Sequence, residues 1–287
     1  MRLIAADSIL TMYGKPEIGT CIDEVLYGMG MEVLEEAGDY VKVRTDYRYE
    51  GYVRKDQTAA GTWEEVWENL EQEKKDTLFL GYACTFARVR QSYADVQSIP
   101  KVQGICLVSI PGGGIVLRGV TNEDGWTAVC LADGRTGYVR EDFLEELITK
   151  PLPEEEFRAA VVETAKRYLG TQYRWGGKSP LGIDCSGLCS ISYMIQGVMI
   201  YRDAQIVEGF PVKPIPFEEK KPGDLLYFPG HIAMYIGDNY YIHSTSRRHS
   251  DGVVINSFDP KDPLYRADLL EKLYAVGSIF AAKQEEL

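Results

Sequence analysis

Two hydrophobic periodicities follow each other in the C-terminal half of the chain. Apolar residues between 157 and 169 recur every three or four positions, which predicts an amphipathic helix that ends at Gly170. A second helix is expected to begin at Cys185, with Asp184 as its N-cap. Antiparallel strands are predicted further along, at 225–228, 231–236, 240–243 and 252–255. Helices followed by an antiparallel sheet indicate an α+β domain.

The N-terminal half contains a pattern that occurs twice. Residues 40–56 and residues 126–142 match without a gap at a constant offset of 86 residues. Each copy predicts a strand with an aromatic start, a polar loop, and a Gly-Tyr-Val-Arg motif that opens another strand. Two copies at so long a spacing favour two small β-barrels of similar build over a solenoid.

A short amphipathic segment separates the two copies. Thr62 and Glu65 have the spacing of a capping box, which marks the start of a helix. Trp63, Val66, Trp67 and Leu70 then fall on one face, which we interpret as packing surface. Pro151 and Pro153 mark the main domain boundary. The predicted organisation is a first barrel at 1–60, a helical linker at 61–76, a second barrel at 77–149 and a catalytic domain at 150–287.

Composition and charge restrict the classes of partner. The 287 residues are 45% apolar and 26% charged, as in ordinary globular proteins. The net charge is −12, so nucleic acid and anionic membrane surfaces are poor partners. The chain has no apolar run long enough to span a bilayer and no secretory signal at Met1, so membrane insertion is not expected and a cytoplasmic location is. A leader removed from the chain would indicate secretion instead. The oligomeric state stays open.

One cysteine stands where a nucleophile would be activated. The six cysteines are too sparse for a disulfide framework, which suits reduced thiols. We interpret five of them as packing residues: Cys21, Cys84, Cys106, Cys130 and Cys189. Cys185 differs because it lies in the first turn of a predicted helix. There the backbone N–H groups and the helix dipole are expected to lower the pKa of a thiol.

The histidines supply a candidate base. Only three occur, and His231 and His243 bracket one predicted hairpin at a separation of 12 residues. A three-residue turn would place the two side chains directly opposite each other, whereas a two-residue turn would shift the register by one. One imidazole could then act on a proton while the other orients it. A nucleophilic cysteine, a base and an orienting group are the requirements for acyl transfer through a thioester.

Other interpretations of these residues stay open. Cys185 and His243 could each be buried packing residues, and His249 reads as an exposed loop residue. Cys185, Cys189, His231 and His243 could also form a zinc site. The chain lacks the usual C-x₂-C spacing, so we expect no metal and no cofactor.

Five motifs resemble the NlpC/P60 cysteine peptidases in their order and spacing. They are Tyr173–Gly177, Asp184–Leu188, Pro222–Leu225, His231–Gly237 and Tyr241–Ser244. The repeated segments, 40–54 and 126–140, resemble bacterial SH3 (SH3b) domains. The resemblance implies a papain-like catalytic domain behind two SH3-like β-barrels. It also implies cleavage of the γ-D-glutamyl bond to the diamino acid of a murein stem peptide.

The same resemblance implies roles for individual residues. Cys185 would be the nucleophile, His231 the general base and His243 the residue that orients the base. Asp184 and Ser186 would contact the free amine of an N-terminal L-Ala. Tyr173 and Trp175 would line the site, with Tyr173 near the oxyanion. Arg202, and Tyr49 of the first SH3b domain, are the other implied substrate contacts. Tyr47 is an alternative to Tyr49. The acid expected beside that tyrosine is undecided among Glu17, Asp23 and Glu24.

The leading hypothesis is therefore a peptidase that processes murein-derived peptides with a free N-terminal L-Ala. The sequence does not distinguish meso-diaminopimelate from L-lysine as the diamino acid. One alternative is a wall-peptide-binding module with residual activity. Another is an amidase or acyltransferase on the same fold.

Overall fold

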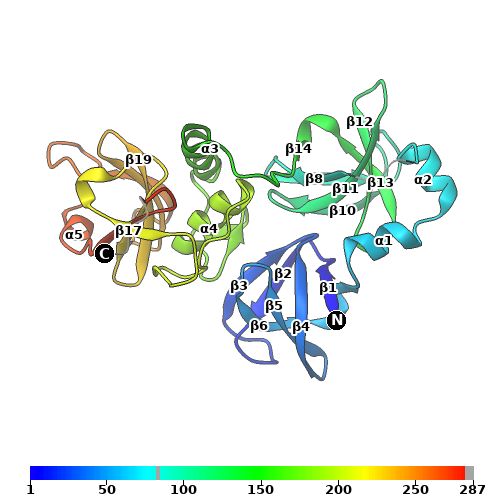
Figure 1. Cartoon of the computed structure of the whole chain (residues 1–287), viewed down its shortest axis with the longest axis horizontal. Helices are drawn as coiled ribbons and strands as arrows, with labels where there is room; N and C mark the ends of the chain where they lie inside the picture. Colours follow the sequence, from blue (N-terminus) through cyan, green and yellow to red (C-terminus); the bar gives the residue numbers. More distant parts are fainter. Residues whose placement is uncertain (82–84, 282–287) are drawn as a thin grey trace, which may run out of the picture. The chain divides into compact units, whose positions relative to one another are not determined.

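The computed structural model describes residues 1–81 and 85–281, which include every predicted site residue but not Cys84. The chain divides into two compact units, Met1–Leu147 and Ile148–Leu287 (Figure 1). This division precedes the prolines at which we placed the main boundary. Each unit is described by itself.

The first unit contains two seven-stranded antiparallel sheets with one topology. The first sheet has the order β3-β2-β6-β5-β4-β1-β7 and the second the order β10-β9-β13-β12-β11-β8-β14, so each strand has its counterpart seven numbers later. The first set is β1 Arg2–Ala5, β2 Ile9–Tyr13, β3 Cys21–Leu26, β4 Gly30–Ala37, β5 Tyr40–Thr45, β6 Glu50–Arg54 and β7 Thr58–Ala60. The second set is β8 Thr85–Val89, β9 Tyr93–Gln97, β10 Cys106–Pro111, β11 Ile115–Thr121, β12 Trp126–Cys130, β13 Thr136–Arg140 and β14 Leu144–Glu146.

The repeat extends further than the matching letters. A 3₁₀ turn follows β6 at Lys55–Gln57, and another follows β13 at Glu141–Phe143. Both turns, and the strands β7 and β14 after them, keep the offset of 86 residues seen in the sequence. The repeated motif therefore encodes the same strand–turn–strand unit twice.

Two helices, rather than the single predicted one, connect the sheets. They are α1, Trp63–Asn69, and α2, Gln72–Leu78. The predicted capping box is present: the Thr62 hydroxyl accepts from the backbone N–H of Glu65, and the Glu65 carboxylate accepts from that of Thr62. The backbone becomes extended at Leu70, with ψ of 138°, and this separates the helices. The predicted apolar stripe packs into a core, because Trp63 and Leu70 are buried there.

The two sheets of this unit share that core. Ile4 and Tyr27 of the first sheet region belong to one buried cluster with residues of the second sheet. The Tyr27 hydroxyl accepts a hydrogen bond of 2.9 Å from the backbone N–H of Ala132. The Trp63 indole donates to the carbonyl of Gly28 at 2.8 Å. The linker therefore packs against both repeats.

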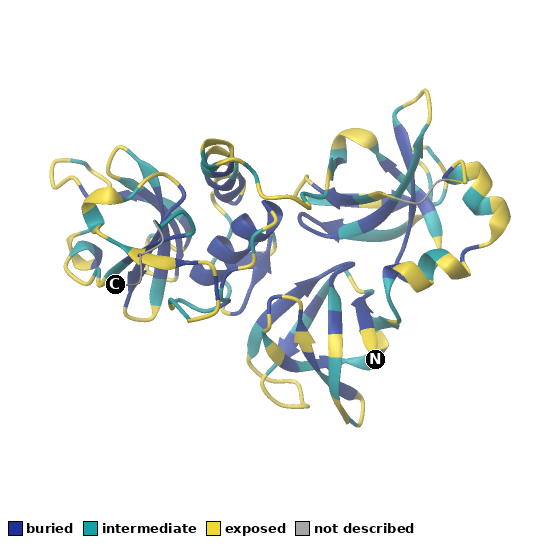
Figure 2. Cartoon of the chain, in the orientation of Figure 1, coloured by how far each residue is buried: buried dark blue, intermediate teal, exposed yellow. Residues whose placement is uncertain are grey.

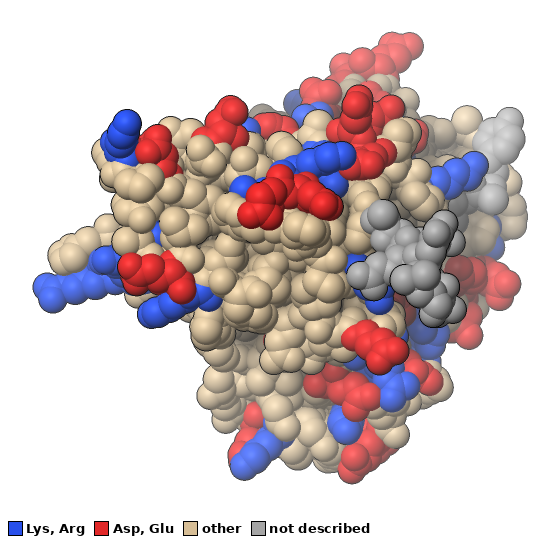
Figure 3. Space-filling view, turned by 60° about the vertical axis from the view of Figure 1, so that its left-hand side comes forward, with Lys and Arg blue, Asp and Glu red and all other residues tan. Residues whose placement is uncertain are grey.

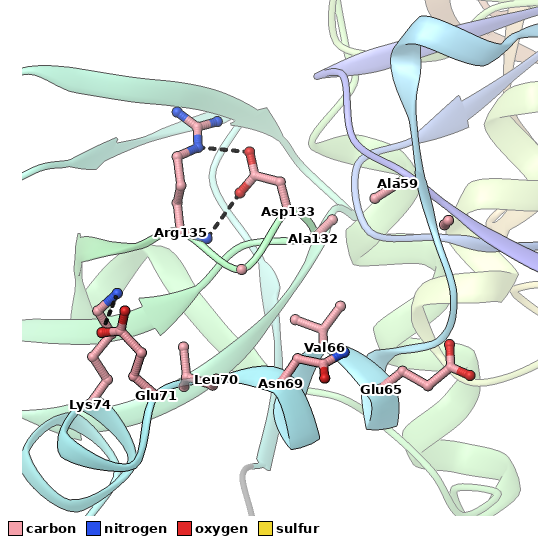
Figure 4. Close-up of a pocket in the computed structure, with 12 residues that line it drawn as sticks. Ala59, Glu65, Val66, Asn69, Leu70, Glu71, Lys74, Ala132, Asp133 and Arg135 are labelled. Carbon is pink, nitrogen blue, oxygen red and sulfur yellow. Dashed lines mark hydrogen bonds and ion pairs between the residues drawn. The ribbon is translucent and has the colours of Figure 1, made fainter.

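A hollow of about 650 Å³ lies beside α1 in this unit. Figure 4 shows Glu65, Val66 and Asn69 of α1 on one side of it and the turn after β12 on the other. That turn contains an ion pair of 2.7 Å between Arg135 and Asp133. The lining thus combines apolar and charged side chains, and nothing in it specifies an occupant.

The second unit contains two helices before a six-stranded antiparallel sheet and a short helix before the last strand of that sheet. The helices are α3 Glu154–Lys166, α4 Cys185–Ile195 and the short α5 Ala267–Leu270. The sheet order is β17-β22-β18-β19-β20-β21. Its strands are β17 Lys213–Ile215, β18 Leu225–Phe228, β19 His231–Gly237, β20 Tyr240–Thr245, β21 Gly252–Ser257 and β22 Ala275–Ser278. A small ribbon, β15 Lys178–Ser179 with β16 Gly182–Ile183, precedes α4, and a 3₁₀ turn lies at Phe217–Glu219.

The four strands predicted for this sheet are present as neighbours, and two were missed. β22 comes from the C-terminal end of the described chain and pairs between β17 and β18. β17 has only three residues and contains Pro214, which removes the usual strand signal. The missed strands extend the sheet on the side away from β19, β20 and β21.

Helix α4 forms the centre of this unit. All its residues are buried, as Figure 2 shows by its dark blue ribbon. It packs against α3 and against β19 and β20. The Tyr193 hydroxyl donates to the carbonyl of Gly223 at 2.5 Å, and the Gln196 amide donates to the Thr164 hydroxyl at 3.0 Å. These contacts fix the helix, and hence its first residue, relative to the sheet.

Charged side chains of both signs lie on the face of the molecule that Figure 3 presents. Figure 3 shows acidic and basic side chains intermixed around an uncharged area on the face that it presents. Among the described residues, the helices are all too short or too polar to cross a bilayer.

Candidate active site

Cys185 is the first residue of α4, as predicted. The Asp184 carboxylate caps the helix by accepting from the backbone N–H of Gly187 at 2.5 Å. The backbone N–H groups of Ser186 and Ile232 lie close enough to the sulfur to lower the pKa of the thiol. Ile232 directly follows His231 in β19, so this proximity places the sulfur at the start of that strand.

The resting charge of the thiol differs from the prediction. Burial, and then the negative charge of Asp184, raise the pKa of Cys185 to about 11. The N–H groups of Ser186 and Ile232 and the charge of Arg202 lower it, but burial outweighs them. The expected lowering of the pKa by the helix start is therefore wrong. The thiol keeps its proton until a base removes it.

His231 and His243 form the expected imidazole pair. Nε2 of His231 lies 2.7 Å from Nδ1 of His243, and the ring centroids are 4.9 Å apart. His243 is completely buried, whereas His231 is half-buried. The pair therefore connects the edge of the site to the interior of the sheet.

The strand register brings the rings together diagonally, whereas a three-residue turn would have placed them directly opposite each other. The turn between β19 and β20 has two residues, Asp238 and Asn239, both with positive φ. A bulge at Ile236 then shifts the register, so that Met234 pairs with Ile242. This register puts His243 opposite Ala233, two residues from His231 and on the same face. The turn alone would displace the register by three residues from direct opposition, and the bulge moves it back by one, so the two rings stay on one side.

Burial keeps both imidazoles neutral. Burial, the neighbouring His243 and then Arg266 lower the pKa of His231 to about 3. Burial lowers the pKa of His243 to about 4, although its hydrogen bond to Asn256 and the charge of Asp268 act in the opposite direction. A neutral thiol beside a neutral imidazole can transfer its proton to that ring during attack on a substrate.

Asn256 completes this arrangement and was missed in the sequence. Its Oδ1 lies 2.9 Å from Nε2 of His243, and its Nδ2 donates to the carbonyl of Leu264 at 2.9 Å. The predicted last strand stopped at Ile255, one residue short of it. Asn256 pairs with Tyr241 in the sheet. A predicted strand that continued one residue further would therefore have included it. We call His231, His243 and Asn256 the sheet relay.

A charged network lies on the other side of the nucleophile. Arg202 is 1% exposed, and its guanidinium donates to both carboxylate oxygens of Asp184 at 3.2 Å and to the Ser186 hydroxyl at 2.7 Å. It also donates to the carbonyl of Gly176 at 3.1 Å. Asp184 accepts from the backbone N–H of Gly176 at 2.8 Å as well. We call Asp184, Ser186 and Arg202 the helix-end cluster.

The hydrogen bonds within this cluster involve three residues that the resemblance assigns to substrate binding, namely Asp184, Ser186 and Arg202. Arg202 is enclosed by protein oxygens, so the structure places it behind the site rather than along it. The Asp184 carboxylate already holds a guanidinium and two backbone N–H groups. The Ser186 hydroxyl donates to Asp184 at 3.1 Å. A contact of Asp184 or Ser186 with a substrate amine stays a prediction.

The remaining predicted residues lie in two different parts of the chain. Burial raises the pKa of Tyr173, and the ionised form of the Cys185 thiol and the negative charge of Asp184 raise it further, so the Tyr173 phenol is a protonated donor close to both groups. Trp175 is 65% exposed. Tyr49 belongs to the first unit, where the Tyr47 hydroxyl donates to the Asp23 carboxylate at 2.5 Å. The roles of Tyr49, Tyr47 and the neighbouring acids stay predictions.

The geometry does not favour the zinc alternative. The two ring nitrogens that face each other, on His231 and His243, are joined by a hydrogen bond. Cys189 is buried within α4. Over residues 1–81 and 85–281, the acids, cysteines and histidines form no cluster of three with metal-binding geometry.

Comparisons with known proteins agree with this site. The family model described as "NlpC/P60 family" matches residues 170–265. Dipeptidyl-peptidase 6 of Lysinibacillus sphaericus is 40% identical over 98% of this chain and 100% of its own length. The gamma-D-glutamyl-L-lysine dipeptidyl-peptidase of Bacillus subtilis is 31% identical over 45% of this chain and 44% of its own. The crystal structure of an NlpC/P60 family protein from Bacillus cereus aligns with a TM-score of 0.74, at 20% identity, over 96% of this chain and 98% of that one.

The chain belongs to the NlpC/P60 family. It is an enzyme of the cysteine peptidase class, and the resemblance seen in its motifs is confirmed. The expected fold class, β-sheet domains before an α+β catalytic domain, is also confirmed.

Proposed function

We propose that the protein hydrolyses the γ-D-glutamyl bond to the diamino acid in murein stem peptides that have a free N-terminal L-Ala. The observation that carries this proposal is the imidazole of His231, hydrogen-bonded to His243, at the start of β19 beside Ile232, whose backbone N–H lowers the pKa of the Cys185 thiol. The name of the Bacillus subtilis relative supplies the bond, and the names of both relatives supply the dipeptidyl-peptidase activity.

The reaction follows from the neutral resting state. His231 takes the proton of the Cys185 thiol as the sulfur attacks the γ-carbonyl carbon, and a tetrahedral oxyanion forms. The Tyr173 phenol is the candidate donor to that oxyanion. His231 then gives its proton to the amine of the diamino acid, which leaves as the thioester forms. Water, deprotonated by His231, hydrolyses the thioester and restores the thiol.

The direct test uses defined peptides. L-Ala-γ-D-Glu-L-Lys and L-Ala-γ-D-Glu-meso-diaminopimelate are incubated with the protein, each with a free and with an acetylated N-terminus, and the products are identified by mass. The expected products are L-Ala-D-Glu and the diamino acid, with faster cleavage of the free peptides. Equal rates on free and acetylated peptides would refute the requirement for a free amine.

The same assay separates the competing hypotheses. Binding of the free peptides without turnover would favour a wall-peptide-binding module. Transfer of the L-Ala-D-Glu group to an added amine, in preference to water, would favour an acyltransferase. A Cys185→Ala protein that still cleaves the peptides would remove the assignment of the nucleophile.

A further inference from the structure

Three polar side chains cross three neighbouring strands of the second unit on one face. His231 belongs to β19, His243 to β20 and Asn256 to β21. His243 pairs with Val254, which lies two residues from Asn256 along β21. On its other side His243 lies opposite Ala233, which is two residues from His231 along β19. The three side chains therefore form a diagonal row with hydrogen bonds of 2.7 and 2.9 Å.

The side-chain amide of Asn256, at the outer end of this row, has a defined orientation. Nδ2 of Asn256 lies 2.9 Å from the carbonyl oxygen of Leu264, and a carbonyl oxygen only accepts hydrogen bonds. The reverse orientation of the amide would set its oxygen against that carbonyl. Oδ1 must therefore face His243, and Nε2 of His243 must carry a hydrogen to donate to it.

The position of the proton on His243 determines the position of the proton on His231, the base. A neutral imidazole carries one ring proton, so His243 with its proton on Nε2 has a bare Nδ1. This Nδ1 lies 2.7 Å from Nε2 of His231 and must accept from it. His231 then holds its own proton on Nε2 and leaves Nδ1 with a free electron pair.

We infer that Asn256 is a positioning residue that sets the tautomers of both histidines and thereby leaves Nδ1 of His231 as the nitrogen that receives the thiol proton. This inference rests on the proposed function, because it names the atom of His231 that acts as the base. Without the amide, Nε2–H of His243 has no acceptor on β21. The ring could then donate from Nδ1 to Nε2 of His231, which would put the proton of His231 on Nδ1 and block it as a base.

The first test reads the tautomers without a substrate. The chain has only three histidines, so the protein labelled with ¹⁵N-histidine gives few ring signals, and His249→Gln assigns the third ring. In the wild type we expect protonated Nε2 and unprotonated Nδ1 on both His231 and His243 at neutral pH. A proton on Nδ1 of His231 would overturn the inference.

The second test links the tautomers to turnover. Asn256→Ala should give mixed tautomers and lower kcat by at least about tenfold with little change in KM. Asn256→Asp keeps an acceptor for Nε2–H, so it should restore the tautomers and much of kcat, and its negative charge should move the acidic limb of the kcat profile to higher pH. Ile255→Ala, on the same strand and on the opposite face, controls for loss of sheet packing.

Each outcome separates the inference from the proposed function. An Asn256→Ala protein with wild-type tautomers and the kcat of Ile255→Ala would overturn the inference, even if the wild type cleaves the peptides. A wild type with the expected tautomers but no hydrolysis would refute the proposed function and leave the role of Asn256 in place. If Asn256→Ala does not fold, the wild-type spectrum and the Asn256→Asp variant still decide.

Discussion

Two buried polar regions flank the Cys185 sulfur, and they handle charge in opposite ways. The helix-end cluster contains a full ion pair between Arg202 and Asp184. The sheet relay contains two imidazoles that burial keeps neutral. Both regions are as buried as the hydrophobic core around them, apart from His231 at the edge of the site.

The difference follows from what each region must do. A buried ion pair costs desolvation free energy, so it persists only where further hydrogen bonds satisfy it, as Ser186 and the backbone of Gly176 do here. Such a region holds the geometry of the loop and the helix start. A neutral imidazole costs less to bury and can still accept a proton. The cluster therefore positions the nucleophile, while the relay receives its proton.

The largest effect is expected from a substitution that removes the sulfur between the two regions. Cys185→Ala should lower kcat by at least about 10³-fold, because the nucleophile is lost. Both regions should stay intact, so the melting temperature should stay close to that of the wild type. Peptide hydrolysis and circular dichroism measure the two quantities. A large fall in melting temperature would mean that the sulfur also holds the regions together.

The next largest effect is expected from a substitution that breaks only the ion pair of the helix-end cluster. Arg202→Met leaves the Asp184 carboxylate buried without its counter-charge, and we expect a loss of about 3–5 kcal/mol in the free energy of unfolding. Urea denaturation measures it. The double variant Arg202→Met/Asp184→Asn keeps an N-cap acceptor without the charge and should recover part of the loss. A single variant as stable as the wild type would show that the ion pair is not what holds this loop.

The neutral region should respond to pH. The folded-state pKa values of His231 and His243, about 3 and about 4, lie below the ordinary value of about 6.5. The unfolded chain therefore takes up protons first as the pH falls. The contribution of the pair to stability is fully present above pH 6.5 and declines toward the folded-state values, by at most about 1.4 kcal/mol per histidine and pH unit.

Unfolding free energies at pH 7 and pH 5 measure this decline. The decline should be smaller in His231→Gln/His243→Gln, which has no imidazole to protonate in the relay. Arg266 also faces both rings and helps to keep them neutral. Equal declines in the wild type and the double variant would contradict the assignment of neutral, buried imidazoles.

The sequence predicted most local features of both regions and missed the contacts that Arg202 and Asn256 make. The capping role of Asp184, the helix start at Cys185 and the pairing of His231 with His243 depend on neighbours in one helix or one hairpin. Asn256 is about as near to His243 in sequence as His231 is, and it was missed because the predicted last strand ended at Ile255, one residue before it. Arg202 reaches Asp184 across 18 residues, through contacts that only the tertiary fold provides. The pKa of Cys185 was mispredicted for the same reason, because burial depends on the whole unit and the helix start does not.

The smallest expected effect concerns the tie between the two regions. The buried Ser244 hydroxyl, next to His243 in β20, donates at 2.6 Å to the carbonyl of Ile183, next to Asp184. Ser244→Ala removes this hydrogen bond and should cost about 1 kcal/mol in the free energy of unfolding. The carbonyl keeps a second donor in the backbone N–H of Arg174, at 3.3 Å, which limits the loss.

The same change tests whether alignment of the two regions matters to turnover. Because the hydrogen bond joins the segment before the nucleophile to the strand of the relay, its loss should lower kcat several-fold and leave the pH dependence of stability unchanged. Ser192→Ala is the matched control, since that buried hydroxyl donates at 2.7 Å to the carbonyl of Leu188 within α4 and joins no two elements. If both variants lower kcat equally, the helix-end cluster and the sheet relay hold their alignment through packing of α4 on the sheet, and the hydrogen bond adds only stability.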